Sequence, residues 1–161
     1  MSKVWNINVL LCEKANDDVS TIENIFDKLV INKKNRRGNF TIVTILNSIE
    51  SDENKMVLFY FLEYLGESEN KILHLFNSSI VKAKNFDEED ISSLPGVSQK
   101  NSKMEIEDCS FPWEGSYEIK VYKYDEVDDL ESDNDTSTRK MMRYMNKSHL
   151  VSTYPFKVQF E

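Results

Sequence analysis

An acidic run late in the chain carries the side chains best suited to bind a cation. Seven of the eleven residues from 125 to 135 are Asp or Glu. Calcium binds several carboxylate oxygens on a bent loop, and the rim of a β-sheet can supply such a loop. However, the run contains no glycine, which an EF-hand loop needs for its sharp turn. We therefore interpret residues 125–135 as a solvated loop with no bound metal, and a Ca²⁺ site is the alternative.

The basic segment 137–147 that follows has the spacing of a helix. Arg139 and Arg143 are four residues apart and share one face, whereas Met141 and Met145 share another. We expect the Met face to pack on the rest of the protein and the basic face to point outward. If these charges matter, they matter for a partner more than for the fold, because exposed ion pairs stabilise proteins only weakly. The candidate partner-binding residues are Arg139, Arg143, Lys147, Asp128, Asp129 and Glu131.

Catalytic motifs are scarce in this sequence. His74 and His149 are the only histidines, and Cys12 and Cys109 lie far apart with no metal-binding spacing. The chain has no glycine-rich phosphate loop and neither of the common hydrolase signatures. We predict no catalytic residues and no cofactor. His74 is expected to pack within an apolar strand, and the two cysteines are expected to be buried thiols of a cytoplasmic protein.

One loop is basic. Residues 33–38 read Lys-Lys-Asn-Arg-Arg-Gly, which is the only basic cluster in a predicted loop. A contact with phosphate or nucleic acid is conceivable there. A solvated turn is the favoured interpretation, because the chain as a whole is acidic.

Composition indicates one globular domain over residues 1–161. Apolar residues make up 40% and aromatic residues 11% of the chain, and the net charge is -8. This charge disfavours a general binder of polyanions and favours a protein partner with a basic surface. The start of the chain lacks a continuous apolar signal region, and no stretch approaches the length of a membrane span. The frequent use of Asn, Lys and Ile points to a bacterium or its phage.

Strict alternation predicts strands. In residues 117–122 the apolar side chains Tyr117, Ile119 and Val121 alternate with polar ones, and residues 156–160 alternate in the same way. One buried and one wet face is typical of an antiparallel sheet. The fold class predicted is mainly β: a single-domain antiparallel β-sandwich with one or two short helices, at about 86–94 and 137–147. The side chains expected inside are Tyr117, Ile119, Val121, Phe156, Val158 and Phe160.

Further strands are predicted along the chain. Residues 39–47 and 55–65 are rich in β-branched and aromatic residues, and the polar residues 51–54 between them read as a hairpin loop. The second of these strands is apolar on both faces, which suits a central position. The remaining strands are 4–12, with Trp5, Ile7, Val9 and Leu11 inside; 71–81; and 104–111, with Met104 and Ile106 inside.

Residues 19–31 fit two structures. Ile22, Ile25, Phe26 and Leu29 have helical spacing, but the segment is rich in β-branched residues, which favour a strand. Leu10-Leu11-Cys12-Glu13, followed by a polar turn and then residues 21–29, resembles the opening of a family of small bacterial β-sandwich proteins of unknown function. The apolar strand 40–46 and Gly115-Ser116-Tyr117 also match, so the similarity covers about residues 4–65 and 104–124. This resemblance implies that 19–31 is a bent strand, which we expect to pair with 4–12, and it implies no activity.

These observations favour a binding protein over an enzyme. A small acidic protein with no visible catalytic set fits a non-enzymatic protein-binding module, such as an inhibitor, immunity or accessory protein of bacterial or phage origin. The alternative is a ligand- or Ca²⁺-binding β-sandwich module that uses the 125–135 rim.

Overall fold

The structure is a computed structural model that describes residues 4–49, 55–82, 97–124 and 149–161. These residues form nine β-strands and no helix, so the described part of the protein is mainly β, as predicted. The two segments predicted to be helical, 86–94 and 137–147, lie outside the described residues. The strands are β1 (Val4–Ala15), β2 (Ile22–Ile25), β3 (Lys28–Ile31), β4 (Arg37–Ile49), β5 (Lys55–Leu65), β6 (Asn70–Lys82), β7 (Val97–Ser110), β8 (Gly115–Tyr124) and β9 (His149–Phe160).

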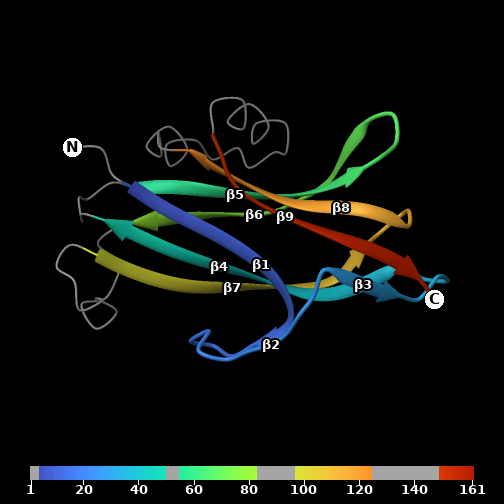
Figure 1. Ribbon diagram of the computed structural model, residues 1–161, viewed down its shortest axis with the longest axis horizontal. Coiled ribbons are helices and arrows are strands. Elements are labelled where there is room, and N and C mark those ends of the chain that lie inside the picture. The colour runs from blue at the N-terminus through green and yellow to red at the C-terminus, as the bar shows by residue number, and fades with distance from the viewer. Residues whose placement is uncertain (1–3, 50–54, 83–96, 125–148) are drawn as a thin grey trace.

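Two sheets pack face to face as a β-sandwich (Figure 1). Sheet A has the order β2-β1-β4-β7, and sheet B has the order β3-β9-β8-β5-β6. Apolar side chains from the inner faces of both sheets form one core, as alternating strands require. The largest wholly buried side chains include Tyr117, Phe61, Phe111 and Leu11.

One strand pair departs from the antiparallel prediction. β3 pairs with β9 in parallel, with Lys28 opposite Lys157 and Ile31 opposite Phe160. All the other strand pairs among the described residues are antiparallel. The chain crosses from sheet A to sheet B at Phe26 and Asp27, between β2 and β3.

The segment 19–31 is extended over most of its length, so the strand interpretation is confirmed over the helical one. The prediction that this segment pairs with residues 4–12 is only partly right. β2 pairs with the end of β1, from Cys12 opposite Ile25 to Ala15 opposite Ile22, whereas β3 joins the other sheet. Asn24 has a positive φ of 55° just before the crossing, a conformation that asparagine tolerates better than most residues. The apolar residues with helical spacing therefore lie in or next to two short strands that belong to different sheets.

The strands predicted at 39–47 and 55–65 are present as β4 and β5, but they do not form a hairpin. β4 lies between β1 and β7 in sheet A, and β5 lies between β8 and β6 in sheet B. The central position of β5 agrees with its apolar character on both faces. Leu58, Tyr60 and Leu62 enter the core between the sheets, and the alternating Phe59 and Phe61 are also buried.

The predicted core is confirmed where its side chains are described. Ile119 and Val121 are wholly buried, and Phe160 is partly buried against the core, as are Met104 and Ile106. The other predicted side chains that are buried are Ile7, Val9, Leu11, Tyr117, Phe156 and Val158. Trp5 belongs to β1, but its side chain lies outside the described set.

Both cysteines are buried free thiols, as expected. β4 separates their strands, so they are not strand neighbours. Burial raises the pKa of the Cys109 thiol to about 12, and it also raises the pKa of Cys12. Both thiols are therefore protonated at neutral pH and poorly suited to nucleophilic chemistry.

Candidate docking surface at the loop end

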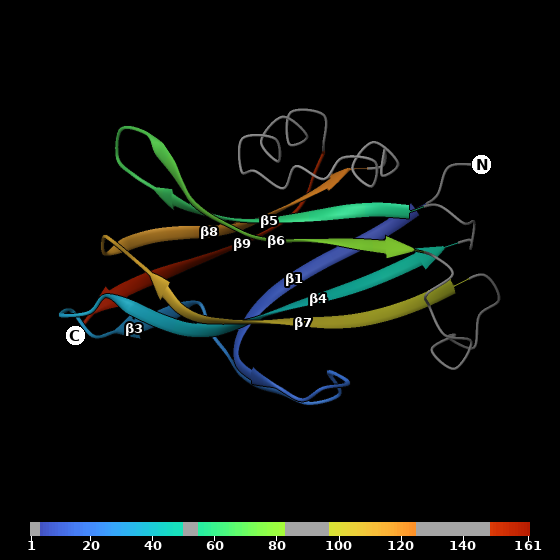
Figure 2. The same ribbon diagram turned by 180° about the vertical axis from the view of Figure 1, so that it is seen from behind.

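Three loops gather at one end of the sandwich. They are the β3–β4 loop (residues 32–36), the β5–β6 loop (66–69) and the β7–β8 loop (111–114). Figures 1 and 2 show them at the end where the C-terminus lies, opposite the N-terminus. We call this set of residues, with the neighbouring Lys71, the loop end. Loops that a rigid sheet scaffold positions are common places for binding residues.

The β3–β4 loop is held by its own asparagines. The Asn32 carbonyl oxygen accepts a hydrogen bond from the Arg36 backbone N–H at 2.8 Å, and the Asn32 side-chain oxygen accepts one from the Lys34 N–H at 2.7 Å. The Asn35 side chain accepts a further hydrogen bond from the Arg37 N–H at 3.2 Å. Such turns formed by asparagine side chains fix a short loop in one conformation. The exposed side chains of Lys33 and Lys34 are therefore presented on a rigid backbone.

Arg36 joins the β3–β4 loop to the β7–β8 loop. Its guanidinium donates a hydrogen bond to the Pro112 carbonyl oxygen at 2.9 Å and lies 5.0 Å from the centre of the Phe160 ring. Its own carbonyl oxygen accepts a hydrogen bond from the Phe111 N–H at 2.9 Å. The basic turn was predicted to be mostly solvated, and Arg36 is exposed as predicted, although its guanidinium also contacts the protein. The other three cations of the cluster, at positions 33, 34 and 37, are exposed as predicted.

Trp113 is the most prominent aromatic side chain of the loop end. Its side chain is 40% exposed, although its ring centre lies 4.9 Å from that of Tyr64. The Lys71 ammonium lies 5.1 Å from the centre of the Trp113 ring. The Tyr117 hydroxyl fixes the Trp113 backbone, because it donates to the carbonyl oxygen at 2.6 Å and accepts from the N–H at 3.2 Å. Burial raises the pKa of Tyr117 to about 12. Trp113 is thus a partly exposed ring on a well-ordered backbone.

Gly115 allows the chain to turn directly after Trp113. Its φ of +130° lies in a region that residues with a Cβ rarely adopt. The glycine therefore sets the direction in which the β7–β8 loop enters β8. Trp113 was not among the site residues predicted from the sequence. The available signal was an aromatic residue placed inside a turn.

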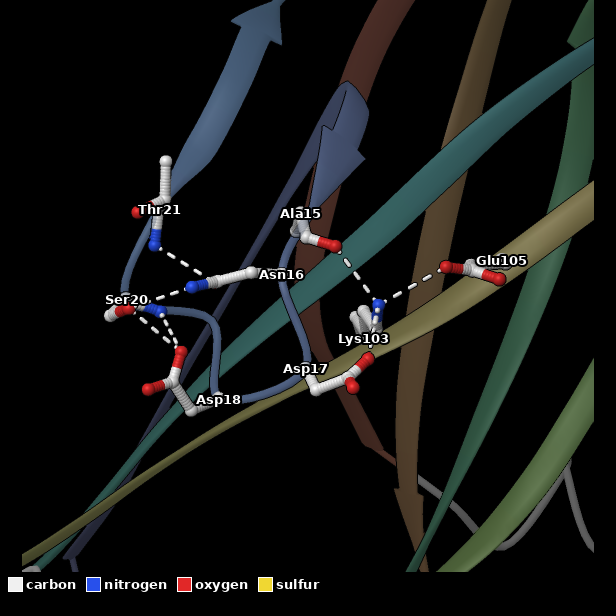
Figure 3. Close-up of polar contacts among 8 residues, drawn as sticks. All are labelled: Ala15, Asn16, Asp17, Asp18, Ser20, Thr21, Lys103 and Glu105. Carbon is white, nitrogen blue, oxygen red and sulfur yellow. Dashed lines mark hydrogen bonds and ion pairs between the residues drawn. The ribbon is translucent and has the colours of Figure 1, made fainter.

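A second candidate is the acidic β1–β2 turn, which Figure 3 shows in close-up. The Asn16 side chain accepts a hydrogen bond from the Thr21 N–H at 2.9 Å and donates one to the Ser20 hydroxyl at 2.8 Å. Asp18 accepts hydrogen bonds from the Ser20 hydroxyl at 2.7 Å and from the Ser20 N–H at 3.1 Å, and these bonds lower its pKa. Val19 at the tip is buried despite its positive φ of 56°. The turn is therefore folded onto the outer face of sheet A.

The place where a cation would sit in this turn is taken by Lys103. Its ammonium donates to the Ala15 carbonyl oxygen at 2.9 Å and lies 3.2 Å from an Asp17 oxygen and 3.1 Å from a Glu105 oxygen (Figure 3). Hydrogen bonds to Glu105 and Asp17 raise the pKa of Lys103. Within the described residues no group of three or more His, Cys, Asp or Glu side chains is placed to hold a metal ion. This turn is best explained as a structural feature.

The β1–β2 turn gives a first prediction. Changing Lys103 to Met keeps the apolar stem and removes the ammonium that holds Ala15 and Asp17. We expect the backbone amides of Val19 and Thr21 to exchange with solvent about tenfold faster or more, because the turn then opens locally more often. Hydrogen exchange followed by NMR measures this. The matched control is Lys14→Met, an exposed lysine on β1, and equal exchange rates in the two variants would contradict the structural role of Lys103.

The predicted partner-binding residues lie outside the described residues. These are Asp128, Asp129, Glu131, Arg139, Arg143 and Lys147, together with the rest of the acidic run and the basic segment. Their roles stay predictions. Of the histidines, His74 is half-buried, with its ring centre 6.0 Å from that of Phe76, which agrees with the packed position expected for it. His149 is exposed at the start of β9.

Comparison with known proteins finds similarity in solved structures only. No protein-family model and no curated protein matches the sequence. The chain is similar to the CARDB domain of a Pyrococcus furiosus protein solved with di-metal ions, at 10% identity and a TM-score of 0.49, covering 99% of this chain and 96% of that one. The family resemblance seen in the sequence therefore stays a prediction, whereas the mainly β fold with two sheets is shown.

Two larger proteins contain a similar region. One is the alkylpurine DNA glycosylase AlkC of Pseudomonas fluorescens, bound to DNA containing an abasic site analog, with 10% identity and a TM-score of 0.49. The other is a mutant β-glucosidase of Listeria innocua in complex with laminaribiose, with 9% identity and a TM-score of 0.47. The match covers only 30% of the glycosylase chain and 16% of the glucosidase chain. At this level of similarity the activities of these proteins say nothing about the present chain.

The described residues contain no helix that is long and apolar enough to cross a membrane.

Proposed function

We propose that this chain is a non-enzymatic module that binds another protein through the loop end. The observation that carries the proposal is the combination of a rigid backbone with a partly exposed Trp113 beside exposed cations. Trp, Tyr and Arg dominate the binding energy of protein interfaces, and a pre-organised surface loses little conformational entropy on binding. An inhibitor, immunity or accessory protein of bacterial or phage origin, acting in the cytoplasm, is the kind of protein that fits.

The charge of the loop end indicates the character of the partner. The net charge of -8 favours a partner with a basic surface at long range. The exposed charges of the loop end are mixed, however: Lys33 and Lys34 lie on the β3–β4 loop next to Arg37 of β4, whereas Glu67 and Glu69 lie on the β5–β6 loop. Screening limits charge effects between exposed groups to about 8 Å at physiological ionic strength, so these local cations act on whatever docks here. We therefore propose that the partner presents acidic side chains to the β3–β4 loop and an apolar surface to Trp113.

The alternative function is a ligand- or Ca²⁺-binding module that uses the 125–135 rim. That rim lies outside the described residues, and the ammonium of Lys103 occupies the acidic site of the β1–β2 turn. No described contact favours a calcium site over a protein-binding surface. The protein-binding proposal is therefore preferred.

Capture of the partner at several salt concentrations tests the proposal. The full chain is immobilised, exposed to a native lysate at low and high salt, and the retained protein is identified and purified. We expect the wild-type chain to retain one partner in stoichiometric amount. At low salt the Lys34→Glu variant should retain several-fold less of this partner, because charge steering toward the basic loop is lost. The control Lys14→Glu makes the same charge change on β1, away from the loop end. A partner that both variants retain equally would show that binding uses another surface.

A further inference from the structure

A cleft of about 470 Å³ lies against sheet B, and the cations of the β3–β4 loop do not line it. Its lining includes two lysines, a serine and an aspartate from three different parts of the chain: Lys28, Lys157, Ser116 and Asp27. Leu65 and Pro155 add apolar surface. The cleft therefore combines a few polar groups with apolar walls, which is the usual composition of a small-molecule site.

Strand register places the two lysines side by side. Lys28 on β3 is the parallel partner of Lys157 on β9, and Ser116 on β8 is the antiparallel partner of the same Lys157. Phe156 and Val158 point into the core, so the alternating Lys157 points outward into the cleft. The same alternation places Lys28 outward, because Leu29 packs against the core. A row of two ammonium groups and one hydroxyl thus crosses three strands.

Neither lysine of this pair forms an ion pair within the described part of the chain. The ion pairs found there involve Lys103 and Lys120, and neither Lys28 nor Lys157 lies within salt-bridge distance of a carboxylate. Like charges directly opposite each other on neighbouring strands destabilise a sheet. Retaining two of them in a cleft is unfavourable for the fold, and an anion between them would remove the repulsion.

We propose that this cleft binds a small organic anion, such as a carboxylate, with its charged group between Lys28 and Lys157 and its apolar part against Leu65 and Pro155. The Ser116 hydroxyl donates a hydrogen bond to the bound oxygens. Asp27 lines the same cleft and leaves it with a net charge of +1, from two ammonium groups and one carboxylate. This net positive charge attracts an anion, and it attracts a doubly charged phosphate ester at least as strongly as a singly charged carboxylate.

Titration with benzoate, followed by backbone NMR, tests this site. We expect saturable binding in the millimolar range, with the largest shift changes at the amides of Lys28, Ser116 and Lys157. Benzyl alcohol has the same ring without the charge, and phenyl phosphate carries about two charges at pH 7.5. Benzyl alcohol is expected to bind more weakly than benzoate because it has no charge, and phenyl phosphate is expected to bind at least as tightly as benzoate because the cleft is positive.

Variants separate the cleft from general attraction to cations. Lys28→Gln with Lys157→Gln is expected to weaken benzoate binding by at least about tenfold, because charged hydrogen bonds to the carboxylate are lost. Lys33→Gln with Lys34→Gln removes the same number of charges from the loop end and is expected to leave affinity unchanged. A dispersed spectrum and an unchanged melting temperature confirm that each variant is folded.

Three results would overturn the proposal: equal loss of affinity in both double variants, binding of benzyl alcohol as tight as that of benzoate, or shift changes spread over the surface without saturation. None of them bears on protein binding at the loop end, because the titration uses no partner protein.

Discussion

Replacing Ile119 with Ala should lower the free energy of unfolding by about 2–5 kcal/mol, the range for large-to-small changes in packed cores. Ile119 is wholly buried on β8, between Leu62 of β5 and Tyr154 of β9 in register. The core around it includes side chains of both sheets, so the cavity left by the missing carbon atoms cannot close by the movement of one loop.

Urea denaturation under two-state conditions measures this effect. The matched control is Glu67→Ala in the exposed β5–β6 loop, which should change stability by less than about 0.5 kcal/mol. A loss below about 1 kcal/mol for Ile119→Ala, with an unchanged denaturant slope, would mean that β8 does not supply the centre of the core.

Some elements could be predicted from the sequence because the relevant information is local. The alternation of Tyr117, Ile119 and Val121 with polar neighbours specifies both a strand and its buried face, and all three are wholly buried. The apolar character of β5 on both faces indicated its central position in the same way. These features depend on side-chain periodicity within a few residues, and no distant contact overrides them.

Strand partners could not be predicted in the same way. The polar residues between β4 and β5 indicate that the chain leaves a strand, but they do not specify whether it returns to the same sheet. Likewise, the composition of residues 19–31 favoured strand, but only long-range packing decides that β2 joins β1 and β3 joins β9 in parallel. A hairpin is the common arrangement for neighbouring strands, and here the chain changes sheets instead.

The candidate site illustrates the same limit. The basic cluster at 33–38 and the turn around Trp113 were both visible in the sequence, at positions about 80 residues apart. Their proximity arises from the hydrogen bond of Arg36 to Pro112 and from the packing of Trp113 on Tyr64. No sequence pattern within a few residues predicts either contact. The residues of the loop end therefore come together only in the folded protein.

Changing Trp113 to Ala should weaken binding of the captured partner by about thirtyfold or more, the effect of losing an aromatic hot spot worth at least about 2 kcal/mol. The ring is 40% exposed, and its backbone is held by the Tyr117 hydroxyl independently of the side chain. The substitution should therefore remove contact area without unfolding the loop. Trp113→Phe keeps an aromatic surface and should retain part of the affinity.

Calorimetry with the purified partner measures its dissociation constant for the wild-type chain and for two variants, and so tests whether the loop end is the docking surface. The second variant, Leu150→Ala, removes an apolar side chain that is 49% exposed at the start of β9 and is not part of the loop end. If the partner docks at the loop end, we expect a large loss of affinity for Trp113→Ala and little change for Leu150→Ala. The melting temperatures of both variants should be unchanged. Unchanged affinity for Trp113→Ala together with a large loss for Leu150→Ala would contradict this expectation and place the docking surface elsewhere.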